Sequence, residues 1–232
     1  MTEEVFTLKT APKNIQYKWK YLFGNLKYDK MSKIKMDTTS TFSVTDYQTA
    51  DLISEIILKL HGINKNSIIV DGTSCVGGNV ISFAKNFKYV YAIEMNKNRI
   101  NILKHNVNIY ELNKKIKILN GDVTLLYKNI PIVDIYFLDP PWGGITYKNT
   151  ETVDLYLSNI HLAEFCLYLK DYTKYIVLKL PKNFNEENFK NIINNQDIIN
   201  NQNNKNNKKS KVKIYEIHRL KKMIIIILKI KN

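Results

Sequence analysis

Apolar positions along the chain follow two different spacings, one typical of strands and one typical of helices. Short apolar runs bounded by glycine, proline or polar residues predict strands at 67–71, 89–94, 116–119, 132–138 and 175–180. Apolar residues recurring every three or four positions predict helices at 45–60, 79–86, 97–111, 153–169 and 186–193. Thr45 is the expected N-cap of the first of these helices, and Gly62 is placed to end it. Residues 212–220 and 223–230 predict a final hairpin.

This alternation of strands and helices predicts an α/β fold. We expect a mostly parallel, seven-stranded sheet with an antiparallel C-terminal hairpin and a short helical N-terminal arm. Residues 1–45 form the expected basic arm, and residues 46–232 form a Rossmann-like domain. An Asn/Lys-rich stretch at about 195–210 is expected to be a flexible loop. Ligands of such sheets bind beyond the carboxyl ends of the strands.

The charge of the chain is concentrated at its two ends. The 232 residues carry a net charge of +14; residues 201–232 alone hold 10 basic residues and one acidic residue. Basic ends around a nearly neutral middle are typical of proteins that attract polyanions. A lysine surplus from an AT-rich genome explains the same pattern, and composition alone does not separate the two.

Other parts of the composition exclude several classes of protein. The two cysteines form no disulfide framework and, with four scattered histidines, no zinc spacing. We therefore expect a reducing, intracellular setting and no metal. The longest aliphatic run, 223–228, is far shorter than the roughly 20 residues that span a bilayer, so we expect no membrane segment. We also expect a monomer.

A glycine-rich turn follows the strand at 67–71 and opens a helix. Its sequence, DGTSCVGGN from Asp71 to Asn79, lacks the G-x-G-x-x-G pattern, which disfavours a dinucleotide pyrophosphate site. Gly77 and its neighbour let the backbone approach a ligand without a Cβ clash. Asp71 would repel a pyrophosphate at this helix N-terminus but suits a cationic, amino-acid-like ligand.

Two further acids follow the next strands along the chain. Glu94 ends the strand at 89–94, where an acid can accept both hydroxyls of a ribose. Asp122 follows Gly121 after the strand at 116–119 and can face an adenine amino group. The three acids Asp71, Glu94 and Asp122 together predict a site for S-adenosylmethionine, although any one of them alone is equally well explained as a solvated acid.

The most specific motif is DPPWGG, from Asp139 to Gly144, at the end of the apolar strand 132–138. Two prolines make a rigid, extended turn that can hold the Asp139 carboxylate and the Pro140 carbonyl against an exocyclic amine. Trp142 can stack on the base that carries the amine, more strongly if the base is cationic. The motif predicts methyl transfer to a base nitrogen.

With these motifs in place, the chain resembles the trimethylguanosine synthases, which methylate N2 of 7-methylguanosine RNA caps. The resemblance extends from about residue 17 to residue 183. It is carried by FSVT at 42–45, VD at 70–71, CVGGN at 75–79, GD at 121–122 and DPPWGG at 139–144, continuing to Tyr147 and ET at 151–152. It implies a class I methyltransferase fold, S-adenosylmethionine as cofactor and 7-methylguanosine-capped RNA as partner.

The resemblance also implies roles for individual residues. Trp142 would stack on 7-methylguanine, and Asp139 with Pro140 would accept the N2 amine. Asp71, Glu94 and Asp122 would hold the cofactor, with Gly77, Thr45 and Thr73 near it. Ser43 and Asn106 would contact the cap nucleotide, and the N-terminal arm would thereby contribute to the cap site. The residues implied for the cap phosphates are Lys18, Tyr147 and Lys182.

Two positions depart from the family pattern. Lys182 stands where arginine is expected, which removes a bidentate fork, and Glu94 replaces a shorter aspartate. Two other functions stay open. One is methylation of another exocyclic amine, guanine N2 or adenine N6, in RNA or DNA; the other is a non-catalytic cap-binding or RNA-binding module. The number of methyl groups added, the natural RNAs, and nucleus or cytoplasm also stay open.

Overall fold

The computed structural model describes residues 3–144, 146–195 and 211–231. Contacts group the chain into two compact units, Met1–Gly121 and Asp122–Asn232. The predicted loop at about 195–210 lies, but for its first residue, outside the described part. The N-terminal arm belongs to the first unit. The predicted boundary near residue 45, between this arm and the Rossmann-like domain, stays a prediction.

The N-terminal arm has its own small core in the first unit. It contains the elements β1 (Val5–Phe6), η1 (Lys13–Ile15), α1 (Tyr17–Phe23), α2 (Tyr28–Met31), β2 (Met36–Asp37) and α3 (Ser40–Ser43), and β1 pairs antiparallel with β2. Trp19 is fully buried, and its indole N–H donates to the Ile34 carbonyl at 2.9 Å. The same apolar cluster includes Val76 and Ile102. The arm therefore packs against the glycine turn, through Val76, and against α6 (Lys97–Ile109), through Ile102.

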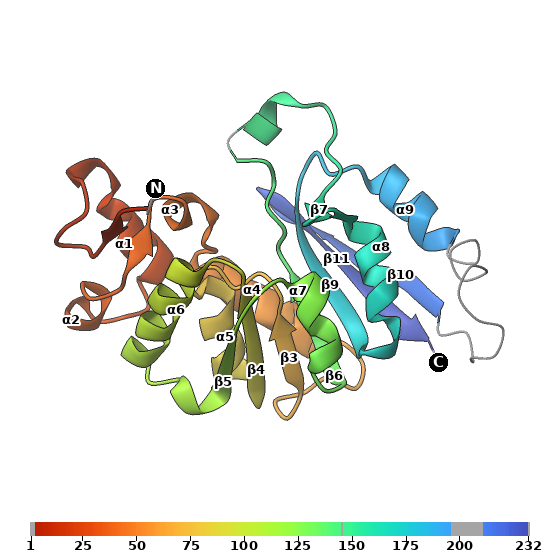
Figure 1. Cartoon of the computed structure of the whole chain (residues 1–232), viewed down its shortest axis with the longest axis horizontal. Helices are drawn as coiled ribbons and strands as arrows, with labels where there is room; N and C mark the ends of the chain where they lie inside the picture. Colours follow the sequence, from red (N-terminus) through yellow and green to blue (C-terminus); the bar gives the residue numbers. More distant parts are fainter. Residues whose placement is uncertain (1–2, 145, 196–210, 232) are drawn as a thin grey trace. The chain divides into compact units, whose positions relative to one another are not determined.

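Three parallel strands form the sheet of the first unit (Figure 1). Its elements are α4 (Tyr47–Leu58), β3 (Ile68–Asp71), α5 (Gly78–Asn86), β4 (Tyr89–Glu94), α6 (Lys97–Ile109), η2 (Asn113–Lys115) and β5 (Ile116–Asn120). Asp71 pairs with Ala92, and Glu94 pairs with Asn120. This register brings the carboxyl ends of the three strands to one edge, where the sequence places the acids and the glycine turn.

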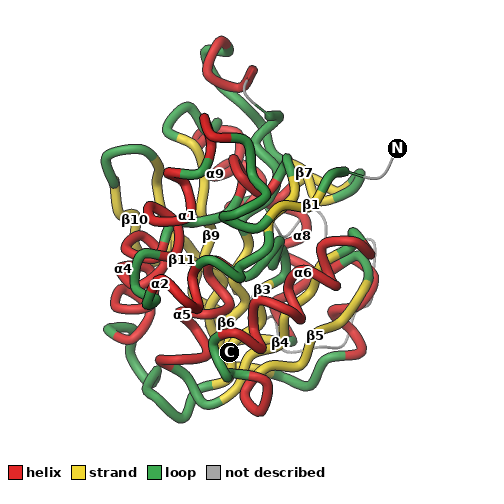
Figure 2. Tube along the Cα trace, turned by 90° about the vertical axis from the view of Figure 1, so that its left-hand side faces the viewer, coloured by secondary structure: helices red, strands yellow, loops and turns green. Residues whose placement is uncertain are grey.

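The second unit contributes β6 (Val133–Leu138), β9 (Thr173–Pro181), β10 (Lys211–Arg219) and β11 (Met223–Lys231), which can be followed in Figure 2. The described residues thus include the predicted seven-stranded sheet. Strand β6 runs parallel to β9, and β11 runs antiparallel to both β9 and β10. The one antiparallel strand and the C-terminal hairpin are therefore confirmed. The elements of this unit are α7 (Val123–Leu126), η3 (Tyr127–Asn129), β6 (Val133–Leu138), η4 (Thr146–Asn149), β7 (Tyr156–Leu157), β8 (Ile160–His161), α8 (Leu162–Tyr168), η5 (Leu169–Asp171), β9 (Thr173–Pro181), α9 (Glu186–Asn194), β10 (Lys211–Arg219) and β11 (Met223–Lys231).

Two helix boundaries differ from the sequence-based prediction. The predicted helix over 153–169 is wrong in its first half, where β7 and β8 form a small hairpin with Ser158 at φ 52°. The prediction failed because the apolar residues of this hairpin and of α8 together recur at the spacing of a single helix. The N-cap of α4 is Asp46, whose carboxylate accepts from the Thr49 N–H at 3.0 Å, and not Thr45. Thr45 is instead buried beside the glycine turn.

Candidate functional site

The turn after β3 lies close to the backbone of Thr45 in the first unit. Gly77 has φ +109°, a left-handed conformation that favours glycine. Gly78 opens α5 so close to Thr45 that a Cβ there would lie 2.5 Å from the Thr45 carbonyl oxygen. The Thr45 hydroxyl accepts from the Asn79 side-chain amide at 3.0 Å. The glycines of this turn are therefore required by backbone geometry before any ligand is considered.

The Glu94 carboxylate joins the end of β4 to this turn. One oxygen accepts from the Cys75 N–H at 2.9 Å, and the other accepts from the Asn96 N–H at 2.8 Å. Each carboxylate oxygen has two acceptor positions, so both oxygens can accept further hydrogen bonds from hydroxyl groups. The longer glutamate thus orders the turn while keeping the acceptors that a ribose requires.

Asp71 lies deeper than its place at a strand end indicates. It is 0% exposed, and it accepts from the Thr73 N–H at 3.1 Å. Its backbone carbonyl accepts from the Ser74 hydroxyl at 3.0 Å. We expected Asp71 at the edge of the core, and the structure places it inside. Burial of a carboxyl group disfavours its charged form, and a cationic ligand group beside it would favour that form.

Asp122 is the first residue of the second unit, and its carboxylate accepts hydrogen bonds from other residues of that unit. Its carboxylate accepts from the backbone N–H and the hydroxyl of Thr124, at 2.8 and 2.7 Å, and from the Ser158 hydroxyl. Burial opposes ionisation, but the hydrogen bonds from Ser158 and Thr124 hold the pKa of Asp122 below its usual value. Asp122 is therefore an ionised helix cap that can also accept from an amino group.

The residues of this set match the chemistry of S-adenosylmethionine. Gly77 and Gly78 keep the turn tight, because a Cβ on Gly77 would meet the Leu103 side chain and one on Gly78 the Thr45 backbone. Asp71 offers a carboxyl group that a cationic ligand group would pair with, Glu94 offers acceptors for ribose hydroxyls, and the pKa of Asp122 is lowered. The assignment of these residues, with Thr45 and Thr73, to the cofactor stays a prediction, because it concerns contacts that only a bound ligand would show.

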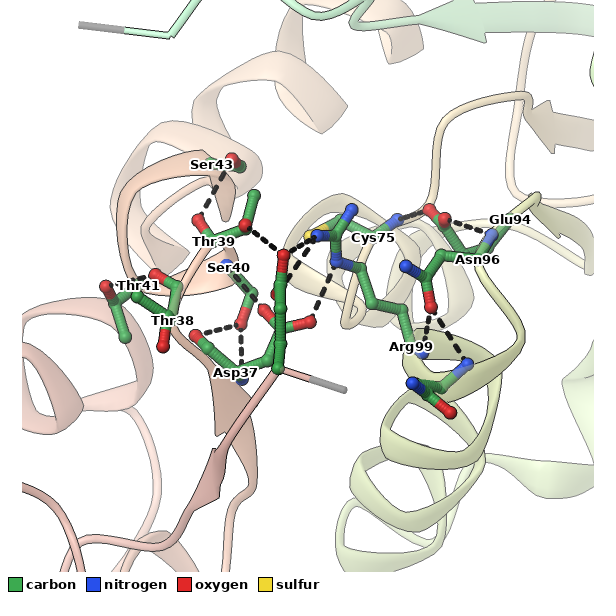
Figure 3. A network of polar contacts seen from close by, with 12 residues as sticks. Asp37, Thr38, Thr39, Ser40, Thr41, Ser43, Cys75, Glu94, Asn96 and Arg99 are labelled. Carbon is green, nitrogen blue, oxygen red and sulfur yellow. Dashed lines mark hydrogen bonds and ion pairs between the residues drawn. The ribbon is translucent and has the colours of Figure 1, made fainter. Parts of the chain in front are cut away.

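An ion-pair network ties the N-terminal arm to α6 (Figure 3). Arg99 donates through Nε to Asp37 at 2.9 Å and through Nη2 to Glu3 at 3.2 Å. The Asp37 carboxylate also accepts from the Ser40 N–H at 2.6 Å. Burial opposes ionisation of Asp37, but the hydrogen bonds from Ser40 and the charge of Arg99 lower its pKa. The sequence analysis missed this network, which fixes the arm beside the helix that follows Glu94.

Asn106 lies in the same junction and is 0% exposed. Its amide oxygen accepts from the Lys35 N–H at 2.9 Å, and its amide nitrogen donates to the carbonyls of Lys35 and Val76 at 2.9 and 3.0 Å. In this structure its side chain joins the arm to the glycine turn, and it faces no solvent. The implied cap contact of Asn106 stays a prediction.

Two other arm residues implied for the cap are more accessible. Ser43 is exposed, and its hydroxyl donates to the Thr39 carbonyl at 3.1 Å (Figure 3). Lys18 donates to the Thr41 carbonyl at 2.8 Å and lies over the ring of Phe42, 3.5 Å from its centroid. Burial lowers the pKa of Lys18. The phosphate contact implied for Lys18 stays a prediction.

The turn after β6 holds a compact charged cluster in the second unit. The Lys179 ammonium lies 2.5 Å from an oxygen of the Asp139 carboxylate and 4.8 Å from the centroid of the Trp142 ring. Burial raises the pKa of Asp139, and the charge of Lys179 and hydrogen bonds from Lys179 and Trp142 partly offset this effect. Pro140, which follows Asp139 in the sequence, is buried, and Trp142 is half-buried. The Lys179 ammonium thus contacts both the acid and the aromatic ring, and their roles toward a base stay a prediction.

The remaining implied phosphate residues are only partly described. Lys182 is exposed directly after β9. The adjacent Asn183 donates from its amide to the Thr150 carbonyl at 2.9 Å, which joins this segment to the loop after η4. The side chain of Tyr147 lies outside the described residues. Within the described residues, no group of three metal-ligating side chains occurs, and no helix is long and apolar enough to cross a membrane.

Sequence comparison places the chain among known methyltransferases. Residues 66–230 match the family described as RNA cap guanine-N2 methyltransferase. The trimethylguanosine synthase of Schizosaccharomyces pombe is 28% identical over 185 residues, which cover 75% of this chain and 73% of that protein. An uncharacterized protein of Acanthamoeba polyphaga mimivirus is 31% identical over 199 residues, covering 76% and 78%.

Solved structures share the fold at low identity. A putative methyltransferase from Porphyromonas gingivalis W83 superposes with a TM-score of 0.59 and 16% identity, covering 85% of this chain and 44% of that chain. The precorrin-6y C5,15-methyltransferase of Geobacter metallireducens GS-15 gives 0.53 and 12%, covering 82% and 92%. The fold is therefore the α/β fold of class I methyltransferases, and the match to a methyltransferase family implies S-adenosylmethionine as the cofactor. With the match over 66–230, this chain belongs to the RNA cap guanine-N2 methyltransferase family.

Proposed function

We propose that this enzyme methylates the exocyclic N2 of 7-methylguanosine in RNA caps, giving 2,7-dimethylguanosine and, after a second transfer, 2,2,7-trimethylguanosine. The family match supports methylation of RNA with S-adenosylmethionine. The observation that carries the finer proposal is the turn after β6, where the Asp139 carboxylate and the Trp142 ring lie in one cluster around Lys179.

The chain's own residues have two tasks in this reaction. S-adenosylmethionine, when bound, supplies an electrophilic methyl group. Trp142 stacks on the base and so limits its orientation, and Asp139 with the Pro140 carbonyl accepts hydrogen bonds from the amine. Orientation of a weakly basic aromatic amine provides most of the rate gain expected here. The Asp139 carboxylate also stabilises the positive charge that develops on the nitrogen.

The base that best fits this cluster is a cationic one. A 7-methylated guanine carries a positive charge, so its attraction to the face of an indole exceeds that of neutral guanine. Cation–π contacts contribute about 0.5–2 kcal/mol, more when desolvated, which corresponds to roughly 2- to 30-fold in affinity. The nearby carboxylate adds to the preference, while the Lys179 ammonium opposes it.

The test compares three acceptors under one buffer: 7-methylguanosine triphosphate, guanosine triphosphate and the bare 7-methylguanosine nucleoside. We expect transfer to the methylated nucleotide, almost none to guanosine triphosphate and slow transfer to the nucleoside. Lys18 and Lys182 are expected to contact phosphates, so the nucleotide's advantage should shrink at high salt. Product mass counts the methyl groups added.

Other results would point to the alternatives. Equal rates for methylated and unmethylated nucleotides would favour a general guanine-N2 or adenine-N6 enzyme. Tight binding of the cap nucleotide with no product, while S-adenosylmethionine binds, would favour a non-catalytic cap-binding module. A nucleoside that reacts as fast as its triphosphate would remove Lys18 and Lys182 from the acceptor site.

A further inference from the structure

Lys179 is a lysine in a place where sequence and packing favour an apolar residue. It lies on β9 between Leu178 and Leu180, both 0% exposed, and it is itself 6% exposed. Its register partner on β11 is Ile225, also 0% exposed. Burying an ammonium costs several kcal/mol unless it is paired and hydrogen-bonded. The buried Lys179 ammonium therefore requires an ionic or hydrogen-bonding partner.

The specific partners are the two acceptor-site side chains. The side chains of Lys179 and Asp139 are 7% and 12% exposed, and the Nζ to Oδ2 distance is 2.5 Å, which marks a strong charge-assisted bond. The same ammonium lies over the Trp142 ring at 4.8 Å. One cation thus contacts both groups that the proposed reaction uses, while the register of β6 with β9 keeps Asp139 and Lys179 adjacent.

A second lysine of β9 shows that an ion pair at this register needs no burial. Lys174 pairs with Asp134 of β6 at 2.7 Å, and its side chain is 62% exposed. The two pairs have the same strand geometry and the same separation along the chain, but only the pair at the carboxyl end is buried and in contact with an aromatic ring. Exposed pairs of the first kind contribute little to stability. Lys174 is therefore a matched control.

We propose that Lys179 is a positioning residue of the acceptor site, which orients the Asp139 carboxylate and the Trp142 indole for the base and acts on the reaction through them. This inference rests on the proposed function for its kinetic part only. A buried ion pair adds little to stability compared with apolar residues of similar size, so its role here is the placement of the acid and the ring.

The kinetic test is a double-mutant cycle between Lys179→Met and Asp139→Asn. We expect Lys179→Met to reduce kcat for 7-methylguanosine triphosphate at least 10-fold, with the KM for S-adenosylmethionine changed less than about threefold. In the Asp139→Asn background the same change should reduce kcat less than about threefold, because its target charge is gone. Lys179→Arg should recover part of the loss, and Lys174→Met should match the parent enzyme. Equal losses in both backgrounds would overturn the proposal.

A spectroscopic test works without turnover. The chain has only two tryptophans, so the indole N–H signals of Trp142 and Trp19 are easily separated by NMR. Titration of Asp139 should shift the Trp142 signal, since the Lys179 ammonium that pairs with Asp139 also lies over the indole ring. Within the described residues, Lys179 on β9 and Trp142 on the same turn bear on this carboxylate. Trp19, bonded to the Ile34 carbonyl, is the internal reference.

In Lys179→Met the midpoint of this titration should rise by at least about one pH unit, the least shift typical of losing an opposite charge at this distance. The titration should vanish in Asp139→Asn and stay in place in Lys174→Met. An unchanged midpoint in Lys179→Met would overturn the proposal. If the parent enzyme fails to methylate the cap nucleotide but the midpoint still shifts, the proposed function fails while the link between Lys179 and Asp139 stands.

Discussion

At the residue scale, Asn106 separates a structural role from a role in binding. Its three hydrogen bonds join Lys35 to Val76, and it is fully buried. Asn106→Ala should lower the free energy of unfolding by about 2–4 kcal/mol, because buried backbone groups lose their partners at about 1–3 kcal/mol each and some regain water. Urea denaturation measures the loss.

The control is Asn108→Ala on the same helix. Asn108 is exposed and accepts only from the Asn113 amide at 2.8 Å, so its loss should change stability by less than about 0.5 kcal/mol. If Asn106→Ala keeps full stability and raises only the KM for the cap nucleotide, the structural role is wrong and the implied cap contact is supported.

At the scale of elements, the C-terminal hairpin carries like charges on facing positions. Lys213 lies opposite Lys229, and Lys211 lies opposite Lys231. Facing like charges destabilise a strand pair, whereas opposite charges contribute roughly 0.2–1 kcal/mol. Lys213→Glu should therefore stabilise the protein by about 0.5–1 kcal/mol at low salt, measured as the midpoint of denaturation.

The gain from Lys213→Glu should depend on ionic strength. In 1 M salt the Debye length falls to about 3 Å, so the difference between Lys213→Glu and the parent protein should largely disappear. Lys213→Gln removes the repulsion without adding attraction and should lie between the two. A gain that is the same at both salt concentrations would assign the effect to strand propensity instead.

At the scale of the whole molecule, stability should fall in acid. Hydrogen bonds and ion pairs hold the pKa values of Asp37, Asp122 and Glu186 below their usual range. A carboxyl group with a lowered folded-state pKa stabilises the protein above its unfolded pKa, near 4, and loses this contribution as pH falls through the folded value. Protonation also adds to a net charge that is already +14.

We therefore expect the free energy of unfolding to decrease progressively below about pH 5. Asp139, whose pKa burial raises, acts in the opposite direction between its unfolded and folded pKa values. Asp37→Asn should be less stable than the parent near pH 7 and should lose less on acidification, because the carboxyl group whose pKa Ser40 and Arg99 lower is gone. Urea titrations at several pH values give both slopes, and parallel curves for the two proteins would contradict the assignment to Asp37.

Local patterns in the sequence were enough to predict most elements of this protein and its most specific motif. The strands β3, β4, β6 and β9 and the C-terminal hairpin follow from short apolar runs bounded by polar or glycine residues, because such runs specify their own conformation. The glycine turn and the Asp-Pro-Pro-Trp turn are equally local, so their chemistry could be inferred without tertiary structure.

Contacts between distant residues were decided by the tertiary structure alone. Lys179 meets Asp139 across 40 residues, Arg99 meets Asp37 across 62, and Asn106 meets Lys35 across 71. A lysine in an apolar strand and an asparagine on a helix give no local sign of their partners, since strand register and helix packing choose them. The spacing over 153–169 likewise fits a helix and a hairpin equally well, and only the packing of the folded chain selected the hairpin for β7 and β8.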